Sequence, residues 1–107
     1  MYSDYMTKST NNQFGQKIKL LRESKSLLQK HLAYSLQIDT PLYSKIERGD
    51  RSAKREQVLV IAKTLEVDKN ELLILWLADK IVDLVDGDEV ALKALKEADK
   101  QVKTKYK

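Results

Sequence analysis

Residues 29–49, QKHLAYSLQIDTPLYSKIERG, restrict the fold of this chain more than any other stretch, because they predict two short helices joined by a tight turn. The turn spans residues 37–39, and Asp39 can cap the second helix by accepting hydrogen bonds from the amides that follow it. Pro41 fits in the first turn of that helix, where the backbone amides have no helical partner. Gly49 can adopt the left-handed conformation that ends many helices. The stretch therefore predicts a closely packed helical pair.

The two faces of these predicted helices differ in chemistry. The inward face is apolar and consists of Leu32, Ala33, Leu36, Tyr43 and Ile46. Ala33 is small enough to let another helix approach closely. The outward face of the second helix is polar and basic, with Thr40, Pro41, Ser44, Lys45 and Arg48 at helical spacing. A short, firmly supported helix with such a face suits the major groove, so the stretch predicts a protein that reads double-stranded DNA.

Composition limits the rest of the molecule. The chain of 107 residues has one Pro, three Gly and no Cys, so we expect a single all-α domain, with a helical extension, whose helices have short connections. The lack of Cys argues against disulfides and thiolate metal sites and suits a cytoplasmic protein. We expect no membrane association, since the sequence contains neither a signal peptide nor a run of about 18 apolar residues.

The net charge of +4 is distributed unevenly. Residues 1–55 hold 11 Lys or Arg against 5 Asp or Glu, whereas residues 56–107 hold 9 against 11. The basic half contains the helical pair, as attraction to phosphate requires. Ordinary solubilising surface charge is the alternative explanation.

The remaining sequence predicts further helices. We expect them at about 14–25 and 54–65, from Asp68 to Gly87, and from Asp88 to about residue 102. Glu71 would complete a capping box with Asp68. The run ELLILWLADKIVDLV is apolar nearly all round, so this helix must be buried on more than one side. Residues 103–107 should fray.

Three regions follow from this pattern. Residues 1–12 are polar and lack periodicity, so they predict a flexible arm. The alternative is an arm that enters a DNA minor groove, although Lys8 is the one cation of this segment. Asn11 or Asn12 could cap the next helix. Residues 13–75 form the predicted DNA-binding domain, and residues 76–107 form a C-terminal helical extension that we expect to serve dimerisation.

The chain resembles the Cro/CI-type (XRE-like) helix-turn-helix regulators over roughly residues 14–75. The matching positions are Ile18, Leu21, Arg22, Gln29, Leu32, Ala33, Leu36, Ile38, Ser44, Ile46, Glu47, Gly49, Arg51, Val58, Ile61, Ala62, Leu65, Val67, Glu71, Leu72 and Leu73. The resemblance implies a lambda-repressor-like, five-helix DNA-binding domain. The chain is also similar to controllers of restriction–modification operons in the run IDTPLYSKIERGDRSAKREQ, with LWLADKIVDLV after it.

Three residues depart from the family pattern. Ser26 and Gln37 stand where the family usually has glycine, so each carries strain of about 1 kcal/mol if its backbone is left-handed. Leu28 replaces the usual Ser or Thr cap, which costs roughly 1 kcal/mol.

The candidate DNA contacts form two groups. Base contacts should come from Thr40, Pro41, Ser44 and Lys45. Lys45 can donate to guanine, and the hydroxyls of Thr40 and Ser44 can bond either kind of base edge. Pro41 can pack on a thymine methyl. Phosphate contacts should come from Gln29, Arg48, Arg51, Lys54 and Arg55; the role of Gln29 is implied by the resemblance. A solvated surface is the alternative for each residue. DNA shape should contribute to specificity as well.

The resemblance also implies that Arg22 pairs with Glu47 and joins the first helix to the end of the recognition helix. Charge reversal at Glu47 should then damage folding and DNA binding together.

Catalysis and metal binding find little support. His31 is the single histidine, no Cys is present, and no Gly-rich phosphate loop occurs, so we expect no enzyme, metal, cofactor or small-molecule ligand. Trp76 lies in an apolar run and predicts a core or interface residue.

One helix-turn-helix covers only part of an operator, so we expect a homodimer with recognition helices about 34 Å apart. The candidate interface is apolar and consists of Leu75, Trp76, Ile81, Val82, Leu84, Val85, Leu92 and Leu95. Alternatively, the last helix covers the preceding helix within one chain. Two other functions remain open: an antitoxin whose extension binds a toxin protein, and an interaction module that has lost DNA binding.

Overall fold

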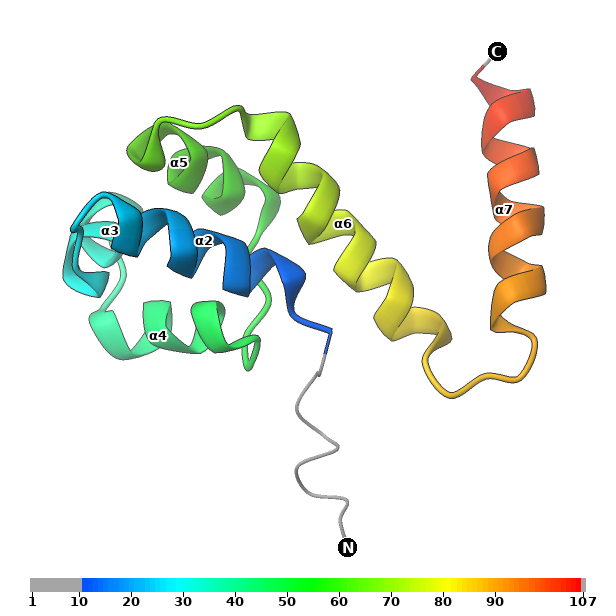
Figure 1. Ribbon diagram of the computed structural model, residues 1–107, viewed down its shortest axis with the longest axis horizontal. Helices are drawn as coiled ribbons and strands as arrows, with labels where there is room; N and C mark the ends of the chain where they lie inside the picture. The colour runs from blue at the N-terminus through cyan, green and yellow to red at the C-terminus, as the bar shows by residue number, and fades with distance from the viewer. Residues whose placement is uncertain (1–10, 107) are drawn as a thin grey trace, which may run out of the picture.

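A computed structural model of the chain describes residues 11–106 and contains six helices and no strand within them. The helices are α2 (Gln13–Ser24), α3 (Gln29–Leu36), α4 (Thr40–Arg48), α5 (Arg55–Leu65), α6 (Lys69–Val85) and α7 (Ala91–Lys105) (Figure 1). The predicted all-α fold, with five helices followed by a helical extension, is confirmed. The predicted flexible arm lies, for residues 1–10, outside the described residues.

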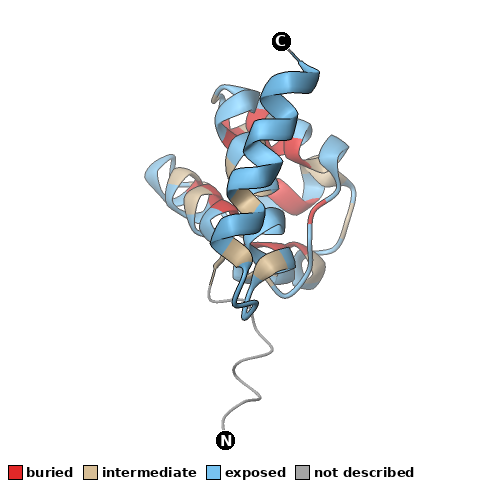
Figure 2. Cartoon of the chain, turned by 90° about the vertical axis from the view of Figure 1, so that its right-hand side faces the viewer, coloured by how far each residue is buried: buried red, intermediate tan, exposed pale blue. Residues whose placement is uncertain are grey.

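The core lies among α2 to α5 and the first part of α6. Its buried side chains are Phe14, Ile18, Leu32, Ala33, Tyr43, Ile46, Ala53, Val58, Ile61, Ala62, Leu65 and Leu72. Full burial of each large apolar side chain contributes about 1.5–3 kcal/mol to stability. Figure 2 shows these buried residues behind an exposed α7, so the core belongs to the first five helices.

The ends of α2 and α4 form as the sequence predicts. The side chain of Asn12 accepts a hydrogen bond from the amide of Gly15 at 3.1 Å and caps α2. Asp39 accepts from the amide of Leu42 at 2.8 Å and caps α4. Gly49 ends α4 with φ of 83°, in the left-handed region. These caps fix the start and the end of the outward-facing helix.

Among residues 11–106, three residues other than glycine have left-handed backbone. Ser26 and Gln37 have φ of 56° and 59°, so both adopt the left-handed backbone on which the predicted strain depends. Glu66 has φ of 59° at the end of α5, which the sequence analysis did not anticipate. A left-handed conformation costs roughly 1–2 kcal/mol for a residue with a Cβ atom.

At the start of α3, a histidine side chain contacts the backbone of the residue before the helix. Leu28 provides no side-chain cap, as predicted. The Nδ1 atom of His31 accepts a hydrogen bond from the amide of Leu28 at 2.8 Å. An imidazole nitrogen accepts only while it carries no proton, so this contact requires an unprotonated Nδ1. His31 therefore has a structural role that the sequence analysis missed.

The second half of the chain departs from prediction in detail. Asp68 caps α6 through the amide of Asn70 at 3.1 Å, but Glu71 forms an ion pair with Lys17 at 3.4 Å instead of completing the predicted capping box. The last helix begins at Ala91 and not at Asp88, because the Asp88 carboxylate accepts from the amide of Val90 and forms a turn there.

The predicted fraying from residue 103 is wrong, since α7 continues to Lys105. Lys103 pairs with Asp99 at 2.9 Å, and the Thr104 hydroxyl donates to the carbonyl of Lys100 at 3.0 Å, so the last turn has side-chain contacts of its own.

Helix α7 stands apart from the rest of the fold. In Figure 1, α6 leaves the five-helix body and α7 turns back beside it at a distance, and no residue of α7 is buried. The alternative in which the last helix covers the outer face of α6 is therefore not the arrangement seen. Among the described residues, no helix combines the length and the apolar character needed to cross a membrane.

Candidate nucleic-acid interface

Helix α4 presents its polar face to solvent on a buried support. Thr40, Pro41 and Lys45 are exposed, while Tyr43 and Ile46, on the other side of the helix, are 0% and 2% exposed. Because the apolar side is locked in the core, the exposed side is held in a fixed orientation. This is the arrangement that reading a groove from one short helix requires.

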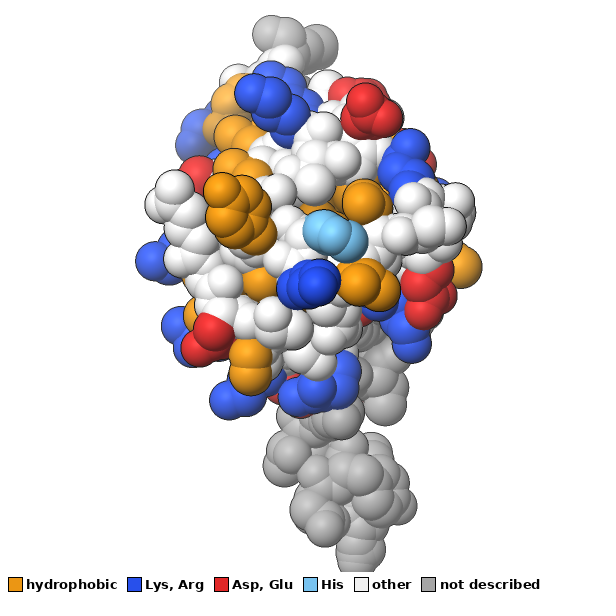
Figure 3. Space-filling view, turned by 90° about the vertical axis from the view of Figure 1, so that its left-hand side faces the viewer, with side chains coloured by type: hydrophobic (Ala, Val, Ile, Leu, Met, Phe, Trp, Pro, Cys, Tyr) orange, Lys and Arg blue, Asp and Glu red, His pale blue; other side chains and the backbone are white. Residues whose placement is uncertain are grey.

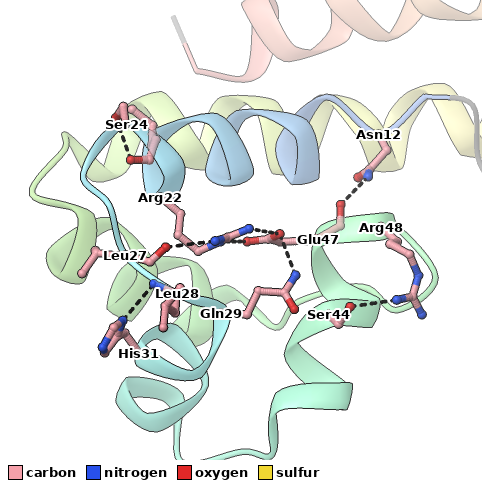
Figure 4. A network of polar contacts seen from close by, with 11 residues as sticks. Asn12, Arg22, Ser24, Leu27, Leu28, Gln29, His31, Ser44, Glu47 and Arg48 are labelled. Carbon is pink, nitrogen blue, oxygen red and sulfur yellow. Dashed lines mark hydrogen bonds and ion pairs between the residues drawn. The ribbon is translucent and has the colours of Figure 1, made fainter.

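A buried ion pair holds the C-terminal half of α4 against α2. The guanidinium of Arg22 donates from Nε to Glu47 Oε2 at 2.6 Å and from Nη2 to Oε1 at 3.1 Å (Figure 4). Arg22 is 8% exposed and Glu47 is 5% exposed. Arg22 also donates to the carbonyl of Leu27 at 2.9 Å, which ties the α2–α3 connection to the same pair.

The ionisation of this pair follows from its contacts. Burial raises the pKa of the Glu47 carboxyl, but hydrogen bonds from Arg22 and Gln29 and the charge of Arg22 outweigh burial, so its pKa lies below the ordinary value. The hydrogen bond to Glu47 raises the pKa of Arg22 despite burial. Burial, and then the neighbouring Glu47, raise the pKa of the Tyr43 hydroxyl, which therefore stays neutral.

A second connection joins the start of α2 to the end of α4. The side-chain amide of Asn12 donates to the backbone carbonyl of Glu47 at 2.8 Å (Figure 4). Gly15 lies against the same carbonyl, and a Cβ atom there would collide with the Glu47 oxygen. The close approach of these two helices therefore requires glycine at position 15, and it fixes the last turn of α4.

A groove lies beside the exposed face of α4, between α2 and α3. It has a volume of about 420 Å³ and is lined by Asn12, Gln16, Lys19, Gln29, Ser44, Glu47 and Arg48. The groove brings together Gln29, Ser44 and Arg48, three of the predicted DNA contacts. The amide of Gln29 donates to Glu47 Oε1 at 3.0 Å, so its position depends on the buried pair.

Gln16 and Lys19 line this groove and were not predicted as contacts. Together with Asn12 they occupy positions i, i+4 and i+7, which lie on one face of a helix. That spacing was visible in the sequence. Which neighbour the face meets was not visible, because it depends on how α2 packs against α3 and α4.

Arg48 is held by its own neighbours on α4 and in the following turn. Its Nη1 donates to the hydroxyl of Ser44 at 2.8 Å (Figure 4). Its Nε lies 3.0 Å from Asp50 Oδ2. Half of the Arg48 side chain remains exposed. A phosphate bound here would compete with the Asp50 carboxylate for the guanidinium.

The remaining predicted phosphate contacts lie where the α4–α5 connection meets α6. Arg51, Lys54 and Arg55 are exposed. The guanidinium of Arg55 lies over the ring of Trp76, 5.8 Å from its centroid, and the ammonium of Lys80 lies 4.8 Å from it. Arg55 is thus directed toward α6 and not toward the groove beside α4.

Helix α6 holds this connection and the start of α2. The indole of Trp76 donates to the carbonyl of Ala53 at 2.8 Å, and Lys80 donates to the hydroxyl of Ser52 at 2.7 Å. The carboxylate of Asp79 accepts from the amides of Gln13 and Phe14 at 3.2 and 2.9 Å. It supplies negative charge where the α2 dipole is positive.

These contacts bear on the predicted dimer interface. Trp76 and Leu75 pack partly buried against the core of their own domain. Ile81, Val82, Leu84 and Leu92 are exposed, whereas Val85 and Leu95 are partly buried. We therefore leave Leu75 and Trp76 out of any surface offered to a second chain.

Other parts of the described surface offer different chemistry. A shallow depression of about 560 Å³ on the α3 side is lined by Leu27, Lys30, His31, Tyr34, Ser35 and Thr64, and it shares no residue with the groove. Figure 3 views the molecule from the side of α3, where basic and hydrophobic side chains are intermixed. Within residues 11–106, no cluster of three His, Cys, Asp or Glu side chains could hold a metal ion.

Comparison with known proteins agrees with this geometry. Residues 13–73 match the helix-turn-helix domain family. The chain is 36% identical over 69 residues to Control protein C.BamHI of Bacillus amyloliquefaciens, an alignment that covers 64% of this chain and 85% of that protein. No solved structure matches the chain. With the outward-facing α4 and its supporting pair, these matches establish that the chain belongs to the Cro/CI-type (XRE-like) helix-turn-helix family of DNA-binding transcriptional regulators.

Proposed function

We propose that this protein binds a two-fold symmetric operator as a homodimer and regulates transcription from it in the cytoplasm. The observation that carries the proposal is the fixed presentation of α4, whose polar face is exposed while Arg22 and Glu47 lock its other side. The groove beside it adds basic and amide side chains at the edge of that face.

In the proposed complex, α4 enters the major groove. Thr40, Pro41, Ser44 and Lys45 contact base edges, with Lys45 donating to guanine. The groove beside α4 receives a phosphate, which Gln29, Arg48 and the newly found Lys19 contact. Arg51 and Lys54 bind the sugar–phosphate backbone at the other end of α4, and Arg55 contributes charge from beside Trp76. Each neutralised phosphate steepens the salt dependence of binding by about 0.9 in logarithmic slope.

The dimer is proposed because one helix-turn-helix domain is too small to cover a two-fold symmetric operator. One recognition helix contacts only half of such an operator, so two copies place their α4 helices about 34 Å apart, one turn of DNA. The outer face of α6 supports this proposal, because Ile81, Val82 and Leu84 are apolar and 42%, 40% and 84% exposed.

The most specific part of the proposal concerns which genes the protein regulates. The similarity to Control protein C.BamHI, together with the sequence resemblance to restriction–modification controllers, supports control of such an operon. An antitoxin is the second candidate, because α7 lies beyond the matched residues 13–73 and exposes apolar side chains that a toxin protein could cover.

The test is binding of the full chain to the DNA immediately upstream of its own gene. Fluorescence anisotropy at fixed salt compares that fragment with a shuffled sequence of the same composition, and sedimentation gives the oligomeric state. We expect tight binding of the native fragment, about 10³-fold or more over the shuffled one, by a dimer. Equal binding of both fragments would refute sequence-specific regulation. Co-purification with a small protein from the adjacent gene would favour the antitoxin.

A further inference from the structure

Helix α7 is amphipathic, but its own chain buries none of its residues. Its apolar stripe consists of Ala91, Leu95, Ala98 and Val102, which share one face at positions i, i+4, i+7 and i+11. None of the residues of α7 is buried: Ala91 and Leu95, in its first half, are partly buried, whereas Ala98 is exposed and Val102 is 55% exposed. Isolated helices of about 15 residues are marginally stable in water, so a helix of this length needs a packing partner.

A second apolar stripe lies on α6, on the side opposite the core. Leu72 is 0% exposed on the inner side, whereas Ile74, Leu77 and Leu84 on the outer side are 66%, 48% and 84% exposed. Ile81 lies on the same outer face at 42% exposure. We call Ile74, Leu77, Ile81 and Leu84 the outer stripe of α6.

The two stripes do not cover one another within one chain. The connection of residues 86–90 contains Gly87, with φ of 77°, and after it α7 runs back at an angle to α6, so that the two helices diverge (Figure 1). The large exposed fractions on both helices agree with this divergence. Each stripe therefore remains available to a second molecule.

Charge distinguishes between the possible pairings. Residues 77–89, which form the C-terminal half of α6 and the start of the connection to α7, contain five Asp or Glu and one Lys, a net charge of −4. Helix α7 contains five Lys and two Asp or Glu, a net charge of +3. We call residues 77–89 the acidic segment. Pairing α7 with α7, or the acidic segment with a second acidic segment, would bring like charges together. Pairing α7 with α6 brings opposite charges within the Debye length of about 8 Å, where screening by salt is incomplete.

We propose that α7 of each copy packs its apolar stripe on the outer stripe of α6 in a second copy, in a reciprocal exchange. The inference rests on the proposed dimer and names the surfaces that form it. Each helix α7 is about 22 Å long, so two exchanged helices extend the dimer contact well beyond the helix-turn-helix domain. The exchange also gives a function to the residues beyond the family match.

The test uses two charge-reversed full-length variants. In the α7 variant, Lys93, Lys96 and Lys100 are replaced by Glu, which changes the charge of α7 to −3. In the acidic-segment variant, Asp83 of α6 and Asp86 and Glu89 of the connection are replaced by Lys, which changes the charge of residues 77–89 to +2. Each variant alone should dimerise at least about tenfold more weakly than the parent. An equimolar mixture should form a heterodimer, since both exchanged contacts in it are again complementary.

A matched pair of single substitutions tests the apolar stripe. Val102→Asp places a charge in the stripe, and Thr104→Asp places the same charge two residues away on the opposite face. In sedimentation equilibrium, Val102→Asp should raise the dimer dissociation constant at least about tenfold, because a valine that the proposed dimer buries is lost. Thr104→Asp should change the dissociation constant by less than about twofold. Circular dichroism checks that all variants keep their helices.

The outcomes separate the exchange from the proposed function. A parent protein that is monomeric at tens of micromolar would overturn both. Variants that dimerise as well as the parent would overturn the exchange and leave the dimer intact. Weakened variants whose mixture does not recover would overturn the exchange in favour of contact within one chain. An intact α7-variant dimer with a reduced salt slope of DNA binding would make α7 a DNA contact instead.

Discussion

Replacing Glu47 with alanine should destabilise the whole domain. The substitution leaves the guanidinium of Arg22, which is 8% exposed, without its carboxylate, and it removes the acceptor of the Gln29 amide. Removing one partner of a buried ion pair costs about 3–5 kcal/mol. In a domain of this size, 1 kcal/mol lowers the melting temperature by about 4–8 °C. We therefore expect a fall of at least about 12 °C.

The control removes both charges together. An Arg22→Met, Glu47→Leu double variant fills similar space without a buried charge, and such replacements are often neutral. Thermal denaturation followed by circular dichroism should show that the double variant recovers most of the stability lost by Glu47→Ala. A fall of less than about 4 °C in Glu47→Ala, or a double variant less stable than Glu47→Ala, would refute this reasoning.

The same pair predicts how stability depends on pH. Because the folded state lowers the pKa of Glu47 below its ordinary value of 4.5, the stabilisation is fully present above that pH. It is lost as the pH falls below 4.5 and through the folded-state pKa. The free energy of unfolding of the parent should therefore fall more steeply in this acid range than that of Glu47→Ala. Parallel curves would contradict the assignment.

Three further predictions concern single positions. Gln37→Gly, and likewise Glu66→Gly, should stabilise the protein by about 0.5–1 kcal/mol in urea denaturation, because glycine relieves left-handed strain while adding freedom to the unfolded chain; a loss of stability would contradict this. Trp76→Phe should lower the free energy of unfolding by about 1–3 kcal/mol, since it removes the shorter of the two hydrogen bonds to the Ala53 carbonyl and leaves the Ser52 hydroxyl at 3.3 Å; an unchanged value would show that the indole contact is dispensable. Lys19→Ala should reduce the logarithmic salt slope of DNA binding by about 0.9 per copy at unchanged melting temperature, and an unaltered slope would remove Lys19 from the interface.

Local signals were enough to predict much of the fold. Asp39, Pro41 and Gly49 each act through their own backbone neighbourhood, so their roles could be assigned before any packing was known. The inward residues of α3 and α4 followed from helical periodicity. The left-handed conformation of Gln37 followed from the glycine expected there.

Contacts between distant segments could not be predicted in the same way. Asp79 caps α2 from a position 65 and 66 residues along the chain, and no local pattern indicates that pairing. Lys19 joins the groove only because α2 packs beside α3 and α4. His31 is an intermediate case, since its spacing of three residues from Leu28 suits a capping contact that single-residue preferences do not include.

The most direct test of the central claim, that α4 reads DNA, measures DNA affinity in a Lys45→Ala, Arg48→Ala double variant. A Lys63→Ala, Lys69→Ala variant removes the same charge from exposed positions outside α4 and serves as the control. With melting temperatures equal to the parent, the first variant should bind the native upstream fragment at least about tenfold more weakly, and the control should bind nearly as the parent does. Parent-like affinity in the Lys45, Arg48 variant would contradict the account.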